Sequence, residues 1–150
     1  MTPRNKNAEI LIQRGIKPSC QRLYIYEYLL DRIDHPTADN VWEGLVEKIP
    51  TLSRTTVYTT LNLLCNKGLV TLITGDYDRI RFDAVTSQHA HFCCDLCKCV
   101  YNVGDTSLDP KDFQIPAGAK IHGVKVYVSG LCVKCVKESA PIPSQSKKAR

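Results

Sequence analysis

Two cysteine pairs have the spacing of metal-binding knuckles. Cys94 and Cys97 form one CxxC pair and Cys132 and Cys135 form another, with 34 residues between the pairs. Each pair can present two thiolates to one tetrahedral Zn²⁺, and four thiolates leave no open coordination position. The interval exceeds that of a simple zinc ribbon, so we expect a folded segment between the pairs. The sequence therefore predicts a closed, structural zinc site.

Two other uses of these cysteines are weaker. Six of the eight cysteines lie between Cys93 and Cys135, and a secreted chain with this pattern would form a disulfide framework. The N-terminus has no apolar stretch behind its basic residues, so we expect neither a secretory signal nor a membrane anchor, and a cytoplasmic location. A pair of redox CxxC motifs would need a thioredoxin-like βαβ context, which the sequence lacks.

A second group of ligand types lies upstream of the first knuckle. His89 and His91 are two residues apart, which on a strand puts both imidazoles on one face. Asp83 and His35 would be further ligands for a divalent ion if the fold brings them together. A polar strand face would explain the histidine pair equally well. We expect no enzyme, because four cysteines close the zinc site and no His-x-Glu or His-Glu-x-x-His motif supplies a general base.

The elements that must position these residues differ along the chain. Residues 1–83 have helical periodicity and residues 84–150 read as short strands. We expect a first helix over residues 4–14, which Gly15 ends. We expect a second helix that begins at Pro18 and Ser19. One face of this second helix would carry Leu23, Tyr24, Tyr28, Leu29 and Ile33. A third helix should run from the N-cap Thr37 to Pro50, and its apolar stripe would consist of Val41, Trp42, Leu45, Val46 and Ile49. A fourth should run from the N-cap Ser53 to Gly68, and its inward-facing residues would be Val57, Leu61, Leu64 and Cys65.

The last of these helices has a polar outer face near its N-terminal end. Recognition helices enter the major groove of DNA with their N-terminal residues, where hydroxyl, amide and guanidinium groups reach base edges and phosphates. A solvated polar face is the alternative. The candidate DNA-binding residues are Arg54, Thr55, Tyr58, Thr59 and Asn62.

Two β-rich runs follow this helix and predict a hairpin. They cover residues 69–73 and 79–82, with a turn at 75–78. Helices followed by a hairpin are typical of a winged helix. Arg79 and Arg81 would alternate on one face of the second strand and reach the phosphate backbone, unless they are simply solvated charges. The net charge of +5 adds little, because opposite charges nearly balance over residues 1–83.

The composition excludes several protein classes. The chain has 150 residues, of which 43% are hydrophobic and 23% charged, as expected for a globular protein rather than a disordered or fibrous one. Its apolar runs are shorter than the roughly 20 residues of a membrane span. We therefore expect no membrane association.

Five motifs together resemble the ferric uptake regulator (Fur) family of metal-dependent repressors. They are HPTAD (35–39), SRTTVYTTL (53–61), RFD (81–83), HAHFCCDLC (89–97) and GLCVKC (130–135), and the resemblance covers about residues 8–138. It implies an α+β fold: a winged-helix DNA-binding domain (1–83), then a small α/β metal-binding dimerisation domain with the four-cysteine zinc site (84–138). A disordered basic tail (139–150) would follow.

The pattern is most similar to the peroxide-sensing branch of the family, PerR. Aspartate at position 83, where iron sensors usually carry glutamate, favours this branch. The resemblance implies a homodimeric repressor that binds a palindromic operator in double-stranded DNA. It also implies that hydrogen peroxide, reacting at bound Fe(II), oxidises His35 or His89 and releases the DNA. Structural Zn(II) would be held by the four cysteines, and regulatory Fe(II) or Mn(II) by His35, Asp83, His89 and His91.

The sequence departs from the family pattern at several positions. Asn102 stands where the fifth regulatory ligand is normally a carboxylate, so this ligand offers a carbonyl oxygen without charge. Thr59 replaces an asparagine of related peroxide sensors, which predicts a different operator preference. Pro110 and Pro116 leave little room for the helix usually found over residues 109–118. Cys93 shares the strand face of the two histidines and offers a soft thiolate.

Two other functions remain open: an iron- or zinc-responsive regulator without peroxide sensing, and a zinc-stabilised adaptor without DNA binding. The remaining candidate ligands have simpler interpretations. We expect Cys20 and Cys65 to be small core residues, Cys99 to be an exposed thiol and His122 to be a surface histidine.

Overall fold

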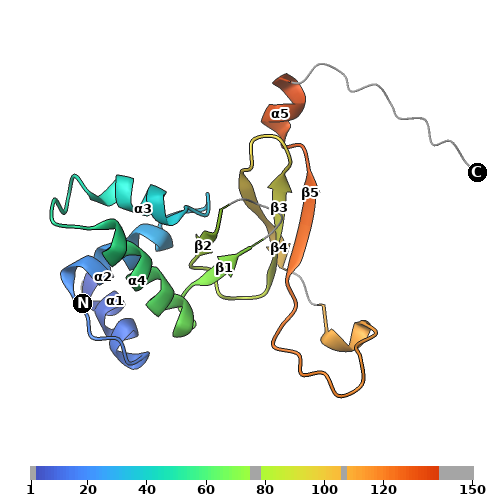
Figure 1. Cartoon of the computed structure of the whole chain (residues 1–150), viewed down its shortest axis with the longest axis horizontal. Helices are drawn as coiled ribbons and strands as arrows, with labels where there is room; N and C mark the ends of the chain where they lie inside the picture. The colour runs from blue at the N-terminus through green and yellow to red at the C-terminus, as the bar shows by residue number, and fades with distance from the viewer. Residues whose placement is uncertain (1–2, 75–78, 106–107, 139–150) are drawn as a thin grey trace, which may run out of the picture.

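The chain order of helices and strands separates a helical part from a sheet. The computed structural model describes residues 3–74, 79–105 and 108–138. Figure 1 shows the first helices gathered on one side, the longer strands on the other, and the short strands β1 and β2 between them. The elements are α1 Pro3–Gln13, α2 Cys20–Leu30, α3 Ala38–Leu45, α4 Arg54–Asn66, β1 Thr71–Ile73, β2 Arg81–Asp83, β3 His89–Cys94, β4 Val100–Asp105, the 3-10 turn η1 Pro110–Asp112, β5 Val126–Gly130 and α5 Val133–Glu138.

Side-chain caps fix where the helices begin. Ser19 accepts a hydrogen bond from the Arg22 amide before α2, and Thr37 and Asn40 form a reciprocal capping box at α3. Ser53 accepts from the Thr56 amide at 3.0 Å at the start of α4. Such caps satisfy amides that have no partner within the helix. The predicted N-caps Thr37 and Ser53 are therefore confirmed.

The helices share one apolar core. Gly68, after α4, has a φ of +67°, a conformation that suits glycine and ends the helix. The predicted helices are correct in kind and slightly too long: α2 ends at Leu30, leaving Ile33 84% exposed, and α3 ends at Leu45, before Val46 and Ile49. The most deeply buried core residues are Leu11, Ile25, Leu29, Val41, Val57, Leu61 and Leu64.

The short strands β1 and β2 form the expected antiparallel hairpin. Thr71 pairs with Asp83 and Ile73 with Arg81, while the turn predicted at 75–78 lies outside the described residues. Because β2 begins at Arg81, Arg79 is not part of the strand. The prediction that Arg79 and Arg81 alternate on one strand face is therefore wrong: Arg79 is exposed and Arg81 is half-buried.

The second sheet has β3 at its centre. β4 pairs with it antiparallel and β5 pairs parallel, giving the order β4-β3-β5. The register places His91 opposite Asn102 and Cys94 opposite Gly130. Between β4 and β5, the described residues contain no helix beyond the turn at Pro110–Asp112, as the prolines predict.

Two further sequence predictions concern the C-terminal tail and membrane spans. The basic tail predicted at 139–150 lies outside the described residues. Within the described ranges, no helix is long and apolar enough to cross a membrane.

The cap of α4 generates a stability prediction. Ser53→Ala removes the acceptor for the Thr56 amide and should lower the free energy of unfolding by about 1 kcal/mol. Urea denaturation of the zinc-loaded protein measures this loss. Thr51→Ala changes an exposed residue outside the cap and is the control; equal losses in both variants would contradict the capping role.

Candidate metal centres

The four knuckle cysteines converge at the end of β3. Their Sγ atoms all lie within 4.8 Å of one another, and those of Cys97 and Cys132 are 3.7 Å apart. With Zn–S bonds of about 2.3 Å, the edge of a tetrahedral site is about 3.8 Å. The cluster therefore fits one tetrahedral Zn²⁺.

Backbone groups prepare this cluster for a cation. Cys94 is the last residue of β3, and the Cys132 amide donates to its Sγ at 3.3 Å. That hydrogen bond, together with the backbone amides of Leu96 and Cys97 and against the effect of burial, lowers the pKa of Cys94 to about 6, which favours the thiolate at neutral pH. Cys135 lies on α5, which carries this ligand back to the end of β3. Cys94, Cys132 and Cys135 are buried, whereas Cys97 is exposed.

A second cluster surrounds the carboxylate of Asp83. Its Oδ2 lies 2.8 Å from Nε2 of His89, 3.2 Å from Nε2 of His91 and 3.4 Å from Nε2 of His35. With metal–ligand bonds of about 2.1 Å, adjacent donors of an octahedral ion are about 3.0 Å apart. The separations therefore suit a divalent ion bound by three imidazoles and one carboxylate.

These ligands come from three segments of the chain. His35 lies in the loop between α2 and α3, Asp83 ends β2, and the two other histidines lie on β3. His35 and Asp83 are only 2% and 3% exposed. The structure thus brings together the four residues whose convergence the sequence left open. At this cluster a loop of the helical part contacts β3 of the sheet.

Backbone groups orient the ligands. Nδ1 of His35 lies 3.2 Å from the Val100 carbonyl and Nδ1 of His89 lies 2.7 Å from the Ser87 carbonyl. A proton on each Nδ1 leaves the Nε2 lone pair free for a metal. The Val85 amide donates to Oδ1 of Asp83 at 2.8 Å, so Oδ2 faces the imidazoles. Sequence reasoning missed these partners, because any residue supplies a backbone carbonyl or amide.

The electrostatics of the cluster also suit a cation. Burial opposes ionisation of Asp83, yet the nearby imidazoles of His35 and His91 and the hydrogen bond from the Val85 amide hold its pKa well below the usual range. Burial by itself would lower the pKa of His35, but Asp83 raises it above the ordinary value. Among the described residues, Nε2 of His35 is a buried polar atom without a hydrogen-bond partner. A divalent ion would satisfy it and balance the carboxylate.

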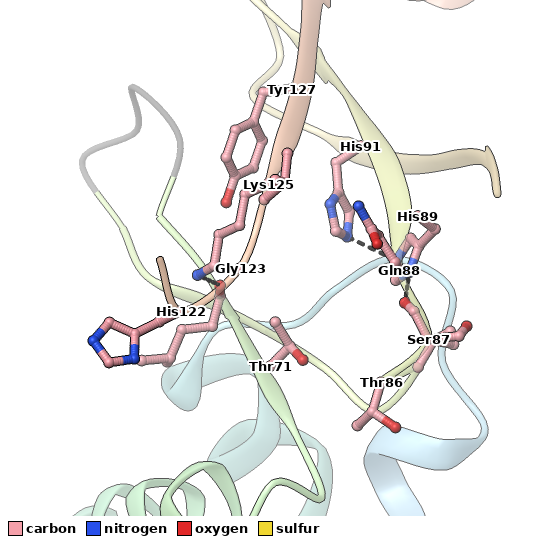
Figure 2. Close-up of a pocket in the computed structure, with 13 residues that line it drawn as sticks. Thr71, Thr86, Ser87, Gln88, His89, His91, His122, Gly123, Lys125 and Tyr127 are labelled. Carbon is pink, nitrogen blue, oxygen red and sulfur yellow. Dashed lines mark hydrogen bonds between the residues drawn. The ribbon is translucent and has the colours of Figure 1, made fainter. Parts of the chain in front are cut away.

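Three other candidate ligands lie around this cluster. Asn102 pairs with His91 in the sheet, and its side chain contributes to the raised pKa of His35, which places the amide beside the site. Cys93 instead packs with Ile73 and Val100, outside the group of converging donors. His122 is exposed, and Figure 2 shows its ring directed away from the two strand histidines.

The remaining sequence expectations for cysteines are partly met. Cys65 packs against the helical core and Cys99 is exposed, as expected. Cys20 is exposed and is therefore not the core residue that we predicted.

An open cavity gives access to the histidines of β3. It has a volume of about 630 Å³, and Figure 2 shows His89 and His91 on its wall. Ser87, Lys125 and Tyr127 also line it. Small solutes can therefore reach the edge of the cluster from this side.

The outer face of α4 is exposed as predicted. Arg54 stacks over the Trp42 ring at 4.0 Å and pairs with Asp39, which fixes its guanidinium near the start of the helix. The Thr59 hydroxyl donates to the Thr55 carbonyl at 2.9 Å. The exposed residues of this face are Arg54, Thr55, Tyr58, Thr59 and Asn62, whereas Val57, Thr60, Leu61 and Leu64 of the opposite face are buried.

The geometry of the knuckles predicts the effect of losing one thiolate. Cys94→Ser should lose tightly bound zinc and unfold the end of the sheet, because zinc binding energy is folding energy in a small site. Zinc content after gel filtration measures this. Cys20→Ser removes an exposed thiol outside the cluster and should keep its zinc; a fully zinc-loaded Cys94→Ser protein would refute the assignment.

Comparison with known proteins agrees with this architecture. The profile of the ferric uptake regulator family matches residues 13–129. The peroxide operon regulator of Bacillus subtilis is 35% identical over 133 residues, which span 87% of this chain and 91% of that protein.

Solved structures share the fold. The Vibrio cholerae ferric uptake regulator is 25% identical, with a TM-score of 0.66 over 84% of this chain and 99% of that one. A zinc uptake regulator complexed with zinc and DNA is 21% identical, with a TM-score of 0.68 over 92% and 98% of the two chains. The chain belongs to the ferric uptake regulator family.

Proposed function

We propose that the chain is a metal-dependent DNA-binding repressor that responds to peroxide. The observation that carries this proposal is the cluster around Asp83. His35 belongs to the loop before α3, while His89 and His91 belong to the sheet. An ion bound by all of them would fix the helical part against the sheet, so metal binding and DNA binding become coupled.

The proposed assignments follow the two parts of the chain. Residues 1–83 form the winged-helix DNA-binding domain and residues 84–138 the metal-binding dimerisation domain. The similarity to a peroxide operon regulator supports the peroxide response. We place the protein in the cytoplasm. We assign it no enzymatic activity, because the cysteine cluster supplies four ligands to zinc and leaves no open coordination position.

Each cluster receives its own metal in this proposal. The four cysteines hold structural Zn(II). The regulatory site takes Fe(II) or Mn(II), with His35, Asp83, His89 and His91 as ligands and Asn102 as a neutral fifth ligand. Imidazole and carboxylate suit these ions better than thiolate does.

The outer face of α4 is the proposed reading surface. Arg54 and Tyr58 can reach base edges or phosphates, with Thr55 and Asn62 beside them. The Thr59 hydroxyl donates to the Thr55 carbonyl of its own helix. The part of the Thr59 side chain that we assign to DNA contact is therefore its methyl group, which can pack against the methyl group of thymine. We assign a phosphate contact to exposed Arg79. Arg81 is bound elsewhere in the structure, and we do not assign it one.

An apolar face of the sheet supports a homodimer. A groove of about 790 Å³ lies between β3, β4 and α5, and its lining consists of Phe92, Tyr101, Val103, Leu131, Cys132, Val133, Lys134 and Lys137. Large exposed apolar groups of this kind mark protein interfaces. A two-fold dimer would present two α4 helices to the half-sites of a palindromic operator.

The cavity beside β3 supports a peroxide response. In this step one oxygen of hydrogen peroxide is inserted into a C–H bond of a ligand imidazole and the other oxygen leaves as water, so the imidazole itself gives the two electrons. Fe(II) held by these side chains would supply the activation of the peroxide. His89 lies on the cavity wall, whereas His35 is buried and is not among the residues that line the cavity. Oxidation of either residue would weaken a metal ligand and release the operator.

Mobility shift of an operator duplex tests the proposed function. The zinc-loaded protein should bind with Mn(II) or Fe(II) and not without them, and peroxide should abolish binding only in the Fe(II) form. Mass spectrometry should then find one added oxygen on His35 or His89. Equal binding without regulatory metal would exclude metal control, and no binding in any state would favour an adaptor.

Because Asn102 is neutral, a carboxylate at this position should increase the affinity for Mn(II). Asn102→Asp adds a negative charge beside the divalent ion and should tighten Mn(II) binding about tenfold or more. Calorimetric titration of the zinc-loaded protein measures it, with Asn5→Asp on α1 as the control of equal charge. Unchanged Mn(II) affinity would place Asn102 outside the coordination sphere.

The reading surface predicts a loss of operator binding. Tyr58→Ala and Arg54→Ala should each weaken it by about 1–3 kcal/mol while zinc content and oligomeric state stay unchanged. Arg79→Ala should weaken binding to all sequences and reduce the salt slope by about one. Lys111→Ala, which removes an exposed charge from η1, is the control. Unaltered operator affinity in the two α4 variants would refute the placement of this helix in the groove.

A further inference from the structure

The guanidinium of Arg81 connects two loops that lie far apart in the sequence. Nη1 donates to the His35 carbonyl and Nη2 to the Lys98 carbonyl, each at 3.0 Å. One loop holds the metal ligand that precedes α3. The other is the turn between β3 and β4, which belongs to the zinc knuckle. Arg81 therefore touches the backbone of both metal centres.

Both bound carbonyls belong to residues with an unfavourable backbone. Among the described residues, His35 and Lys98 are the two non-glycine positions with positive φ, at 49° and 60°. L-residues avoid this region, and Pro36 further restricts the residue before it. Such conformations persist only where surrounding contacts determine them. Arg81 supplies one of those contacts to each residue.

Neighbouring backbone hydrogen bonds continue the connection on both sides. The Phe82 amide donates to the Pro36 carbonyl at 3.0 Å, which attaches the loop of His35 to β2. The Lys98 amide donates to the carbonyl of the zinc ligand Cys94, also at 3.0 Å. An unbroken series of contacts thus runs from the zinc knuckle through Lys98 and Arg81 to His35.

We propose that Arg81 is a positioning residue for the regulatory metal site. Its fork holds His35 in the strained conformation that directs Nε2 at Asp83, and it ties that conformation to the zinc knuckle. This inference rests on the proposed function in one respect, namely that His35 is a metal ligand. It replaces the phosphate contact predicted for Arg81 from the sequence.

The sign of the effect on metal affinity separates this role from simple electrostatics. A cation near a divalent ion repels it, so loss of the Arg81 charge alone would tighten Mn(II) binding. Loss of the positioning contacts would weaken it. Lysine keeps the charge but not the planar fork that reaches two carbonyls, so Arg81→Lys removes the geometry without removing the charge.

Mn(II) titration of zinc-loaded Arg81→Gln and Arg81→Lys proteins tests the proposal. Arg81→Gln should weaken Mn(II) binding about tenfold or more, the usual effect of losing a group that orients a metal ligand, and Arg81→Lys, which keeps the repelling charge, should weaken it at least as much. Arg14→Gln is the matched control, because Arg14 also donates to a backbone carbonyl, that of Lys67, and neither residue belongs to a metal cluster. It should leave Mn(II) affinity unchanged.

Hydrogen exchange gives a second readout that needs neither regulatory metal nor DNA. Without Mn(II), the amides of Phe82 and Lys98 should exchange faster in Arg81→Gln than in the wild type and in Arg14→Gln. If Arg81→Gln loses its zinc, Arg81→Lys decides the question by the same measurements.

Three outcomes would overturn the proposal. They are unchanged Mn(II) affinity in the zinc-loaded Arg81 variants, tighter Mn(II) binding, and weaker DNA binding with Mn(II) affinity and exchange unaltered. A wild-type protein that binds Mn(II) without binding the operator would count against the repressor function alone, and the effect of Arg81 would still be measured.

Discussion

The buried carboxylate of Asp83 sits where the helical part of the chain meets the sheet. It is 3% exposed, and its Oδ2 lies within 3.4 Å of imidazole nitrogens from the α2–α3 loop and from β3. An unpaired buried carboxylate is costly, so this charge requires cationic partners. The imidazoles can meet that requirement as protonated groups or jointly with a divalent ion.

The backbone of His35 is strained, so its position depends on the contacts that hold it. Its backbone has positive φ, and its carbonyl, its Nδ1 and the following residues are all bound to other segments. A ligand held in a sparsely populated conformation returns to other conformations when its contacts are lost. Loss of one of these contacts therefore weakens the attachment of the α2–α3 loop to the neighbouring segments.

The two metal clusters were predictable to different degrees. Each cysteine knuckle is local, since a CxxC spacing brings two thiolates together whatever surrounds it, and two knuckles suffice for one zinc. His89 and His91 share a face through strand alternation, but Asp83 and His35 reach them only because the β1–β2 hairpin and the loop before α3 pack against β3. The exposed face of α4 could likewise be predicted, since helical periodicity separates Tyr58 from Val57 without any tertiary information.

The sequence alone determined what local geometry controls: the helices and their caps at Thr37 and Ser53, the knuckles, the strand face of the histidines and the absence of an α-helix from the described residues around Pro110 and Pro116. Tertiary structure decided which side chains lose their freedom through distant contacts. Arg81 reads as a surface charge on a strand, yet it binds the carbonyls of His35 and Lys98, and Cys93 turns into a small apolar cluster instead of the metal site. The physical reason is that spacing within one element follows from fixed backbone geometry. The distance between elements depends on how the whole core packs, and backbone carbonyls and amides carry no residue type by which a sequence could reveal them.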